Sequence, residues 1–375
     1  PINAIPSLNS QIALHLPIQR LRRGFGYLAS PTFIVNIAIS AALCTITACA
    51  PREPTYPVLM VSSPVVSPSG DKVAFAVTRG EEGALDFQAG VEAFSKTTDT
   101  RMWVVSLKNG EATDTRAEIC TASTPLTWAH DESHIVFVSG RLDPLHNPSF
   151  QSLESIDLQS HELALIESER AWGPKYSANG THLGYIRDTD LIVENVQAKE
   201  RKLLAKRVNR YNWCWGVGNS RVFYIRDGFL VCEFSLQSQT ERILHSASPE
   251  QGGGPLHVVC SPDGSLLGYC IDDWFTTIDL RTGETRKRFK CGHYFLAFDW
   301  NASGICYVDA LDGDQRTNAR LMVFNPSRET STPIAEGVFA FPSWASDSQI
   351  IVRKGNAELW LYSVADGTGS KLFGP

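Results

Sequence analysis

One short turn pattern recurs seven times along this chain of 375 residues, and it restricts the possible folds more than any other feature. The clearest copy, CSPDGSLLGYC from Cys260 to Cys270, reads as two short strands joined by a tight reversal at Asp-Gly. Related segments start at Val66, Trp128, Tyr176, Trp215, Trp300 and Trp344. From Trp128 onward, successive copies start 39 to 48 residues apart, which is a spacing typical of propeller blades.

Each copy continues into the same succession of strands. The strand after the turn is rich in aromatic and branched residues, namely Phe75, Phe137, Tyr185, Phe223, Tyr269, Tyr307 and Val352. An alternating third strand, such as RMWVVSL or ELWLYSV, and a fourth strand beyond a polar turn complete the unit. Seven units of four antiparallel strands predict an all-β protein with the fold of a seven-bladed β-propeller.

Large aromatic residues recur just before the turn. They are Trp128, Tyr176, Trp215, Trp300 and Trp344. Such rings can stack on a ligand, but recurrence at one structural position is typical of core packing. We therefore expect them to pack one blade against the next.

The ends of the repeat array predict how the ring closes. The first unit begins with an inner strand, and the last one ends at KLF on an outer strand, so no strand exchange is required. The stretch from Tyr56 to Val61 is a candidate to pair with an outer strand and cover an exposed edge.

The segments PSWASDS, PKYSANG, PVVSPSG and VVCSPDG resemble the propeller repeat of the TolB family. The resemblance spans nearly all of the chain after Pro57 and implies the propeller fold together with protein partners. It identifies no partner-binding residues in this sequence, because blades of this kind occur in scaffolds, in peptidases and in carbohydrate lyases.

Residues 1–48 have the pattern of an export signal. Three arginines, Arg20, Arg22 and Arg23, precede an apolar run that ends in small residues. Residues 46–49, Ile-Thr-Ala-Cys, resemble a bacterial lipobox, which predicts acylation of Cys49. The expected organisation is a signal peptide over 1–48, a tether over 49–56 and the propeller over 57–375.

The alternative to cleavage is an uncleaved transmembrane helix, which polar residues within the run disfavour. In both cases the arginines lie on the N-terminal side, so the remainder is expected outside the cytoplasm. Ala50 stands where an Asp would favour retention in the inner membrane. The predicted location is therefore the periplasmic side of the outer membrane, in a bacterial cell envelope.

Composition excludes one class of partner. A net charge of -6 argues against binding to nucleic acid, which needs a concentrated basic surface. We expect a monomer without a cofactor. Seven cysteines follow Cys49, an odd number without metal-type C-x-x-C spacing, and most are expected to be small buried residues on strands.

A candidate binding site follows from the topology. The connections between second and third strands are enlarged in three units, and they share one face of the ring with the links between units. Basic and aromatic residues of those links form the candidate site: Arg170, Trp172, Arg210, Tyr211, Trp213, His257, His293 and Tyr294. We expect an envelope protein, a peptide or a glycan to bind there, so that the protein serves as a scaffold.

No catalytic residue or metal ligand is assigned. The sequence lacks a G-x-S-x-G nucleophile motif, and His130 and His134 are interpreted as surface residues beside a turn. Asp309, Asp312 and Asp314 do not have the spacing of a known calcium loop. The enzyme alternative is a lyase-like carbohydrate-active propeller, with His257, His293 and Arg210 converging on a metal at the channel mouth.

Overall fold

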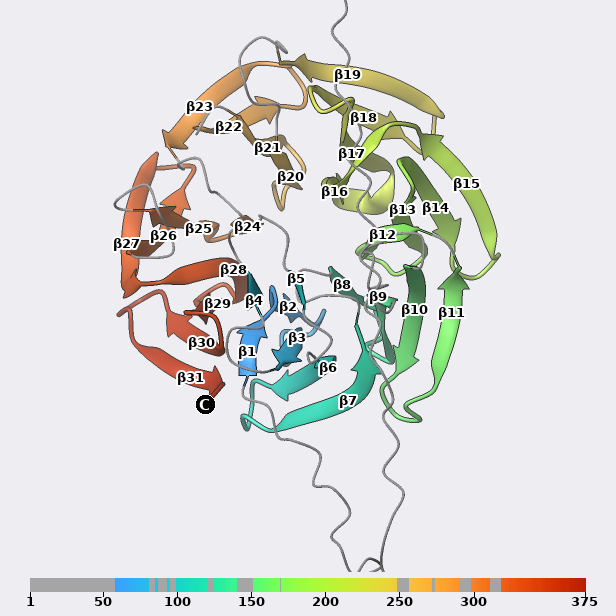
Figure 1. The fold of residues 1–375 in the computed structure, drawn as a ribbon. Helices are drawn as coiled ribbons and strands as arrows, with labels where there is room; N and C mark the ends of the chain where they lie inside the picture. Colours follow the sequence, from blue (N-terminus) through green and yellow to red (C-terminus); the bar gives the residue numbers. More distant parts are fainter. Residues whose placement is uncertain are drawn as a thin grey trace, which may run out of the picture. The chain divides into compact units, whose positions relative to one another are not determined.

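A computed structural model describes residues 58–80, 85–86, 93–94, 99–119, 125–139, 151–168, 170–247, 256–271, 274–290, 298–310 and 318–375. These residues belong to one compact unit that runs from Tyr56 to Pro375. Seven antiparallel sheets stand around an axis in this unit, and the predicted seven-bladed propeller is confirmed (Figure 1). The predicted signal peptide, the tether and Cys49 lie outside the described residues.

The strands of the first four blades follow in order from the axis outward. Blade 1 consists of β1 (Val58–Val61), β2 (Val65–Val66), β3 (Lys72–Arg79), β6 (Asp99–Ser106) and β7 (Ala112–Glu118). Blade 2 consists of β8 (Leu126–Trp128), β9 (His134–Ser139), β10 (Ser152–Asp157) and β11 (Leu163–Glu167). Blade 3 consists of β12 (Ala171–Tyr176), β13 (His182–Arg187), β14 (Asp190–Asn195) and β15 (Glu200–Ala205). Blade 4 consists of β16 (Val208–Trp215), β17 (Arg221–Arg226), β18 (Leu230–Ser235) and β19 (Thr240–Ser246).

The last three blades repeat this order. Blade 5 consists of β20 (Leu256–Cys260), β21 (Leu266–Ile271), β22 (Trp274–Asp279) and β23 (Thr285–Lys290). Blade 6 consists of β24 (Phe298–Asn301), β25 (Gly304–Ala310), β26 (Ala319–Asn325) and β27 (Thr330–Gly337). Blade 7 consists of β28 (Phe339–Ser346), β29 (Gln349–Lys354), β30 (Glu358–Ser363) and β31 (Gly369–Phe373). A short hairpin of β4 (Leu85–Asp86) and β5 (Ala93–Phe94) lies between β3 and β6.

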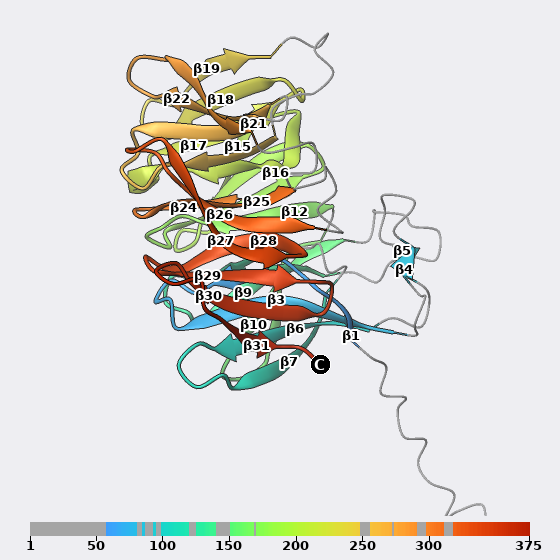
Figure 2. The ribbon, with the colours of Figure 1, turned by 90° about the vertical axis from the view of Figure 1, so that its left-hand side faces the viewer.

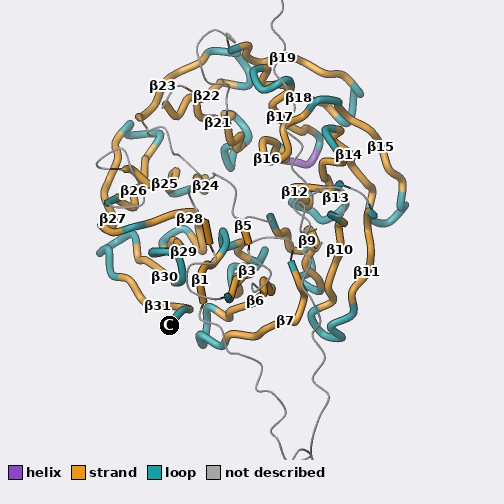
Figure 3. Tube along the Cα trace, in the orientation of Figure 1, coloured by secondary structure: helices purple, strands orange, loops and turns teal. Residues whose placement is uncertain are grey.

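Strands and turns account for almost all of the described chain, as Figure 3 shows. Within that part of the chain, the 3-10 helix η2 (Val217–Asn219) is the helical element, and no helix is long and apolar enough to cross a membrane.

The recurring turn is stabilised as its residues predict. In blade 5 the carboxylate of Asp263 accepts hydrogen bonds from the Ser261 hydroxyl at 2.6 Å and from the Ser265 N–H at 3.1 Å. Gly264 has a φ of 70°, a conformation that residues with a Cβ rarely adopt. Local chemistry therefore sets the position of each hairpin.

The core lies between neighbouring blades. The seven residues predicted on the second strands are all buried, with exposed fractions of 0 to 3%. One apolar cluster, for example, joins Ile186 and Leu191 of blade 3 to Trp213 and Tyr224 of blade 4. Each sheet is thus covered on both faces by the adjacent sheets.

The aromatic residues before the turns contact the preceding blade, and this prediction is confirmed. Trp128 donates its indole N–H to the Val65 carbonyl at 2.9 Å, and Trp215 donates to the Lys175 carbonyl at 2.9 Å. Trp344 donates to the Asp299 carbonyl at 3.2 Å. The other two use different contacts: Tyr176 Oη lies 2.8 Å from His134 Nε2, and the Trp300 ring lies 6.1 Å from that of Phe275.

The ring closes without exchanging a strand, as expected. β31 is the outermost strand of blade 7, and β1 with β2 forms the inner strand of blade 1. The proposed pairing of the stretch from Tyr56 to Val61 with an outer strand is wrong, because Met60 and Val61 pair with Thr78 and Val77 of β3. The eight-residue β3 is long enough to pair with both pieces, and this position buries Met60 and Val61.

Blade 1 and blade 7 are joined chiefly by side chains. The Phe373 ring packs against Phe75, with ring centroids 4.9 Å apart, and against Trp103 at 5.4 Å. Two hydrogen bonds add to this seam, from the Val61 N–H to the Asn356 carbonyl at 2.7 Å and from Arg353 to the Val61 carbonyl at 3.2 Å.

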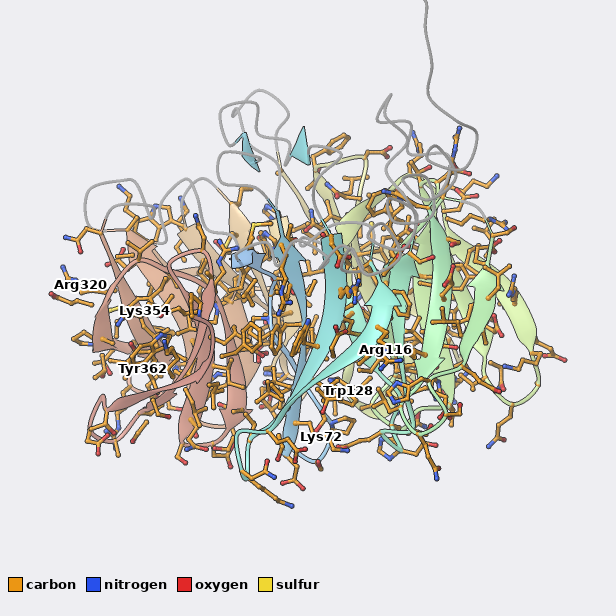
Figure 4. All side chains as sticks on the ribbon, turned by 60° about the horizontal axis from the view of Figure 1, so that its bottom comes forward. Lys72, Arg116, Trp128, Arg320, Lys354 and Tyr362 are labelled. Atoms are coloured by element: carbon orange, nitrogen blue, oxygen red, sulfur yellow. The ribbon has the colours of Figure 1, made fainter. Side chains whose placement is uncertain are left out.

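The two faces of the ring differ in their connections. Because the strands are antiparallel, the turns after the first and third strands lie on one face, which we call the turn face. Connections between second and third strands and between blades lie on the other, the loop face. The β4–β5 hairpin stands on the loop face (Figure 2), whereas Lys72, which follows a first turn, lies at the opposite end from Arg320 (Figure 4).

Candidate functional site

The candidate site is built on the inner strands β12, β16 and β20, which start at the loop face and lie nearest the axis (Figure 1). Pairing of these strands with their neighbours is interrupted near the middle, between Trp172 and Lys175, between Val208 and Trp213, and between Leu256 and Val259. Such interruptions turn backbone groups and side chains away from the regular sheet.

The first residue of each recurring turn segment, such as Tyr176 in blade 3 and Cys260 in blade 5, is called the turn anchor. Two interruptions contain a residue with positive φ at the same position of the repeat, three residues before this anchor. Gly173 has a φ of 55° in blade 3, and His257 has a φ of 50° in blade 5. A residue with a Cβ is strained there by about 1–2 kcal/mol. The His257 N–H donates to Asn212 Oδ1 of blade 4 at 2.9 Å, which holds this backbone in place.

The two tryptophans of the predicted site are packing residues in this fold. Trp213 is fully buried and donates its indole N–H to the Gly173 carbonyl at 3.0 Å. Trp172 is 8% exposed and belongs to the same apolar cluster between blades 3 and 4. Neither ring offers an open face on which a ligand could stack.

The remaining predicted residues are placed unevenly. Arg170 precedes β12 on the loop face, is about half exposed and forms an ion pair with Asp188 at 3.1 Å. Arg210 and Tyr211 belong to β16, but their side chains lie outside the described residues. His293 and Tyr294 also lie outside the described residues.

Sequence reasoning missed Lys175, which is the central cation of the site. Its Nζ crosses from β12 to blade 4, donates a hydrogen bond to the Trp213 carbonyl and lies 5.3 Å from the centroid of the Trp213 ring. Protein atoms surround the ammonium group, although the residue keeps partial solvent exposure, and this burial lowers the pKa of Lys175.

A positional signal could have identified Lys175. It directly precedes the turn anchor, and equivalent residues of other blades also reach the next inner strand. The Thr127 hydroxyl accepts from the Tyr176 N–H at 3.2 Å, and Asp299 Oδ2 accepts from the Trp344 N–H at 2.9 Å. The backbone at this position is the same in these blades, but blade 3 carries a lysine where the other two carry Thr127 and Asp299.

Two further groups lie near the Lys175 ammonium. Burial, together with the charge of Lys175, lowers the pKa of His257 to about 4, so its imidazole is neutral at pH 7. Burial raises the pKa of the Cys214 thiol to about 12, against the opposing effect of Lys175. We call Lys175, Asn212, Cys214 and His257 the inner-strand cluster.

Other sequence interpretations are also decided. His134 is half-buried, since its ring contacts Tyr176 and burial lowers its pKa, whereas His130 is exposed. Asp312 and Asp314 lie outside the described residues, and burial raises the pKa of Asp309.

The described cysteines fit the structural interpretation. Cys232 and Cys306 are buried thiols on strands, and Cys214 and Cys260 are half-buried thiols on β16 and β20. Among the described residues no group of three or more His, Cys, Asp and Glu side chains could hold a metal ion.

Comparisons with known proteins identify the fold. No family model matches the chain, and no curated protein is similar in sequence. Tricorn protease superimposes with a TM-score of 0.59 at 9% identity over 85% of this chain, which spans 34% of that protease. Oligogalacturonate lyase, in complex with manganese, gives 0.57 at 14% identity over 83% of this chain and 90% of the lyase.

TolB from Acinetobacter baumannii gives a TM-score of 0.47 at 11% identity over 78% of each chain. The superpositions on tricorn protease and oligogalacturonate lyase show a shared propeller architecture, and identities this low do not transfer a function. Membership in the TolB family stays a prediction.

Proposed function

We propose that this protein is a binding and scaffolding propeller of the bacterial cell envelope, anchored by lipid at Cys49, that holds a protein, peptide or glycan at its loop face. The observation that carries the proposal is the inner-strand cluster. A cation, a neutral imidazole, an amide and a thiol gather from three consecutive blades, on inner strands that start at the loop face. Binding sites commonly combine such convergent polar groups with a rigid support.

A charge-reversal pair tests the binding face. Arg170→Glu changes a half-exposed residue on the loop face, whereas Lys199→Glu changes an exposed residue in a turn on the opposite face. Immobilised protein would be exposed to solubilised envelopes and to an oligosaccharide panel. We expect Arg170→Glu to weaken capture at least tenfold and Lys199→Glu to leave it unchanged. Equal effects of the two changes, or no saturable capture, would contradict the proposal.

The anchor is tested separately. Cells that express the full chain would be fed an alkyne-labelled palmitate, and the protein would be examined for label and for sedimentation with membranes. We expect both in the wild type and neither in Cys49→Ser, since two or more acyl chains are needed for stable attachment. An unlabelled protein that still sediments would favour the transmembrane alternative.

The second candidate is a lyase-like carbohydrate-active enzyme, and His257 favours it. Its imidazole is neutral at pH 7 and so has an unprotonated ring nitrogen, which a general base for β-elimination from a uronate requires. Ultraviolet absorbance of unsaturated products from oligogalacturonate, with and without Mn²⁺, would detect this activity. Turnover that disappears in His257→Ala would support the enzyme, and no turnover in the wild type would remove it.

A further inference from the structure

Lys175 differs from the neighbouring cations of blades 3 and 4 in its partners. Arg201 pairs with Glu194 at 2.8 Å, Arg221 with Glu233 at 3.5 Å, and Arg242 also contacts Glu233. Lys175 forms no ion pair with any carboxylate of the described residues. The group that holds its Nζ is a neutral carbonyl, that of Trp213.

Among the described residues, the groups near Lys175 do not supply a negative charge. The Cys214 thiol has a pKa of about 12, and the His257 imidazole is neutral at pH 7. A buried charge without a counter-ion is costly, so the group gives up its proton or acquires an anion. The Lys175 ammonium group has three N–H bonds. It contacts the face of the Trp213 ring and donates to one carbonyl oxygen, so it can still donate a hydrogen bond to a ligand.

We propose that Lys175 holds the carboxylate of a ligand bound at the inner-strand cluster. The inference rests on the proposed function, because it assigns a ligand class to the cluster on which that function depends. One ammonium group balances one carboxylate charge, whereas a phosphate dianion would keep a negative charge that the neutral groups around Lys175 do not compensate. A carboxylate group is present both in a uronate sugar and in an acidic peptide.

A purely structural role for Lys175 makes a different prediction. Thr127 and Asp299, at the same position of the repeat, tie their blades to the next one without a ligand. If Lys175 did only this, its replacement would lower stability and would leave ligand discrimination unchanged.

The test compares trigalacturonate and triglutamate with neutral trigalactose by calorimetric titration. The wild type is expected to bind at least one carboxylate probe ten times more tightly than trigalactose, and the stronger probe identifies the source of the carboxylate. Lys175→Gln keeps a donor for the Trp213 carbonyl and removes the charge, and Lys175→Met removes both. Both variants are expected to lose this tenfold preference, whereas Lys202→Met, on exposed β15, keeps it.

Affinity for the carboxylate is also expected to fall as pH rises, because the binding form of Lys175 is protonated. Binding of all three probes alike, binding of none, or an undiminished preference in Lys175→Gln would each overturn the proposal. The proposed function is tested by Arg170→Glu and the carboxylate site by Lys175→Gln, so failure of one proposal can be distinguished from failure of the other. If ligand capture depends on Arg170 but not on Lys175, the proposed scaffold function stands and the proposed carboxylate site is wrong.

Discussion

At the scale of single residues, the ring depends on side chains that reach from one inner strand to the next. The indole N–H groups of three anchors donate to carbonyls of residues that occupy the same position in the preceding blade: Val65, Lys175 and Asp299. A carbonyl that faces the neighbouring blade needs a donor there, since burial without one is costly. The repeated tryptophan supplies a flat apolar ring and this donor together.

The first prediction concerns one of these donors. Trp344→Phe keeps an aromatic ring and removes the N–H that lies 3.2 Å from the Asp299 carbonyl and 3.1 Å from the Gly304 carbonyl. One buried and one partly buried carbonyl lose a partner, so the free energy of unfolding should fall by about 1–2 kcal/mol. Urea denaturation measures it, with Trp274→Phe on the third strand of blade 5 as control. A loss no greater than that of the control would refute this role for the indole.

The second prediction concerns pH. Burial lowers the pKa of His257 to about 4, below its ordinary value of 6.5. The folded protein therefore favours the neutral ring, and the unfolded chain takes up the proton first as pH falls. The resulting stability is complete above pH 6.5 and is lost between pH 6.5 and 4, by roughly 2–3 kcal/mol. Denaturation at a series of pH values should show a shallower dependence in His257→Gln, and parallel curves would argue against this titration.

At the scale of strands, the outer edges of the blades are not equivalent. Leu165, Leu203 and Ile243 occupy the same register on β11, β15 and β19 and are 44 to 63% exposed. Lys287 and Lys371 stand at this position on β23 and β31. Charged residues discourage an edge strand from pairing with another chain, and β11 has none between Leu163 and Leu165.

The third prediction tests this edge. Leu165→Lys places on β11 the residue type that β23 and β31 carry in the same register. We expect less concentration-dependent aggregation on mild heating, measured by light scattering. The free energy of unfolding should change by less than about 0.5 kcal/mol, because the site is exposed. Lys202→Met serves as a control on the next blade. Unchanged scattering would show that this edge is already protected.

The last strand carries the fourth prediction. Phe373 of β31 packs on Phe75 and Trp103 across the seam between blades 7 and 1. Removal of this half-buried ring by Phe373→Ala should cost about 2 kcal/mol, less than a fully buried phenylalanine. Leu165→Ala, at a site 63% exposed, is the matched control and should cost little. If both changes have the same effect on the denaturation midpoint, β31 does not help to close the ring.

At the scale of the whole molecule, the seam between blades 7 and 1 is the place where the ring can open. Every blade is a continuous piece of chain, so no backbone pairing spans the seam between strands of the two terminal blades. Side-chain packing closes it, together with one backbone hydrogen bond and one hydrogen bond from the Arg353 side chain. We expect such packing to open before a pair of hydrogen-bonded strands separates, because fewer hydrogen bonds hold the two surfaces together.

The fifth prediction follows from this closure. Amide hydrogen exchange, measured by mass spectrometry, should be faster in β1 and in β30–β31 than in the corresponding strands of blade 4. In Phe373→Ala the difference should grow at the seam and stay unchanged in blade 4. Uniform exchange around the ring would mean that the propeller opens as a single cooperative unit.

The sequence by itself determined the blades. Turn chemistry at Asp263 and Gly264 acts within a few residues, and strand alternation together with the repeat period is equally local, so both can be read along the chain. The position of the anchors between blades also followed, because a residue that recurs at one point of every unit must meet an equivalent neighbour in a closed ring.

Only the tertiary structure decided which side chains meet at the axis. Lys175, Cys214 and His257 belong to three blades about 40 residues apart, and the repeat that contains the lysine does not contain the Trp213 carbonyl to which it crosses. The same distance between chain position and contact hid the burial of Trp172 and Trp213. The pairing of β1 with β3 was also missed, although these strands are close in the chain. Convergence at an axis depends on how all the blades pack around it, and no single repeat contains that information.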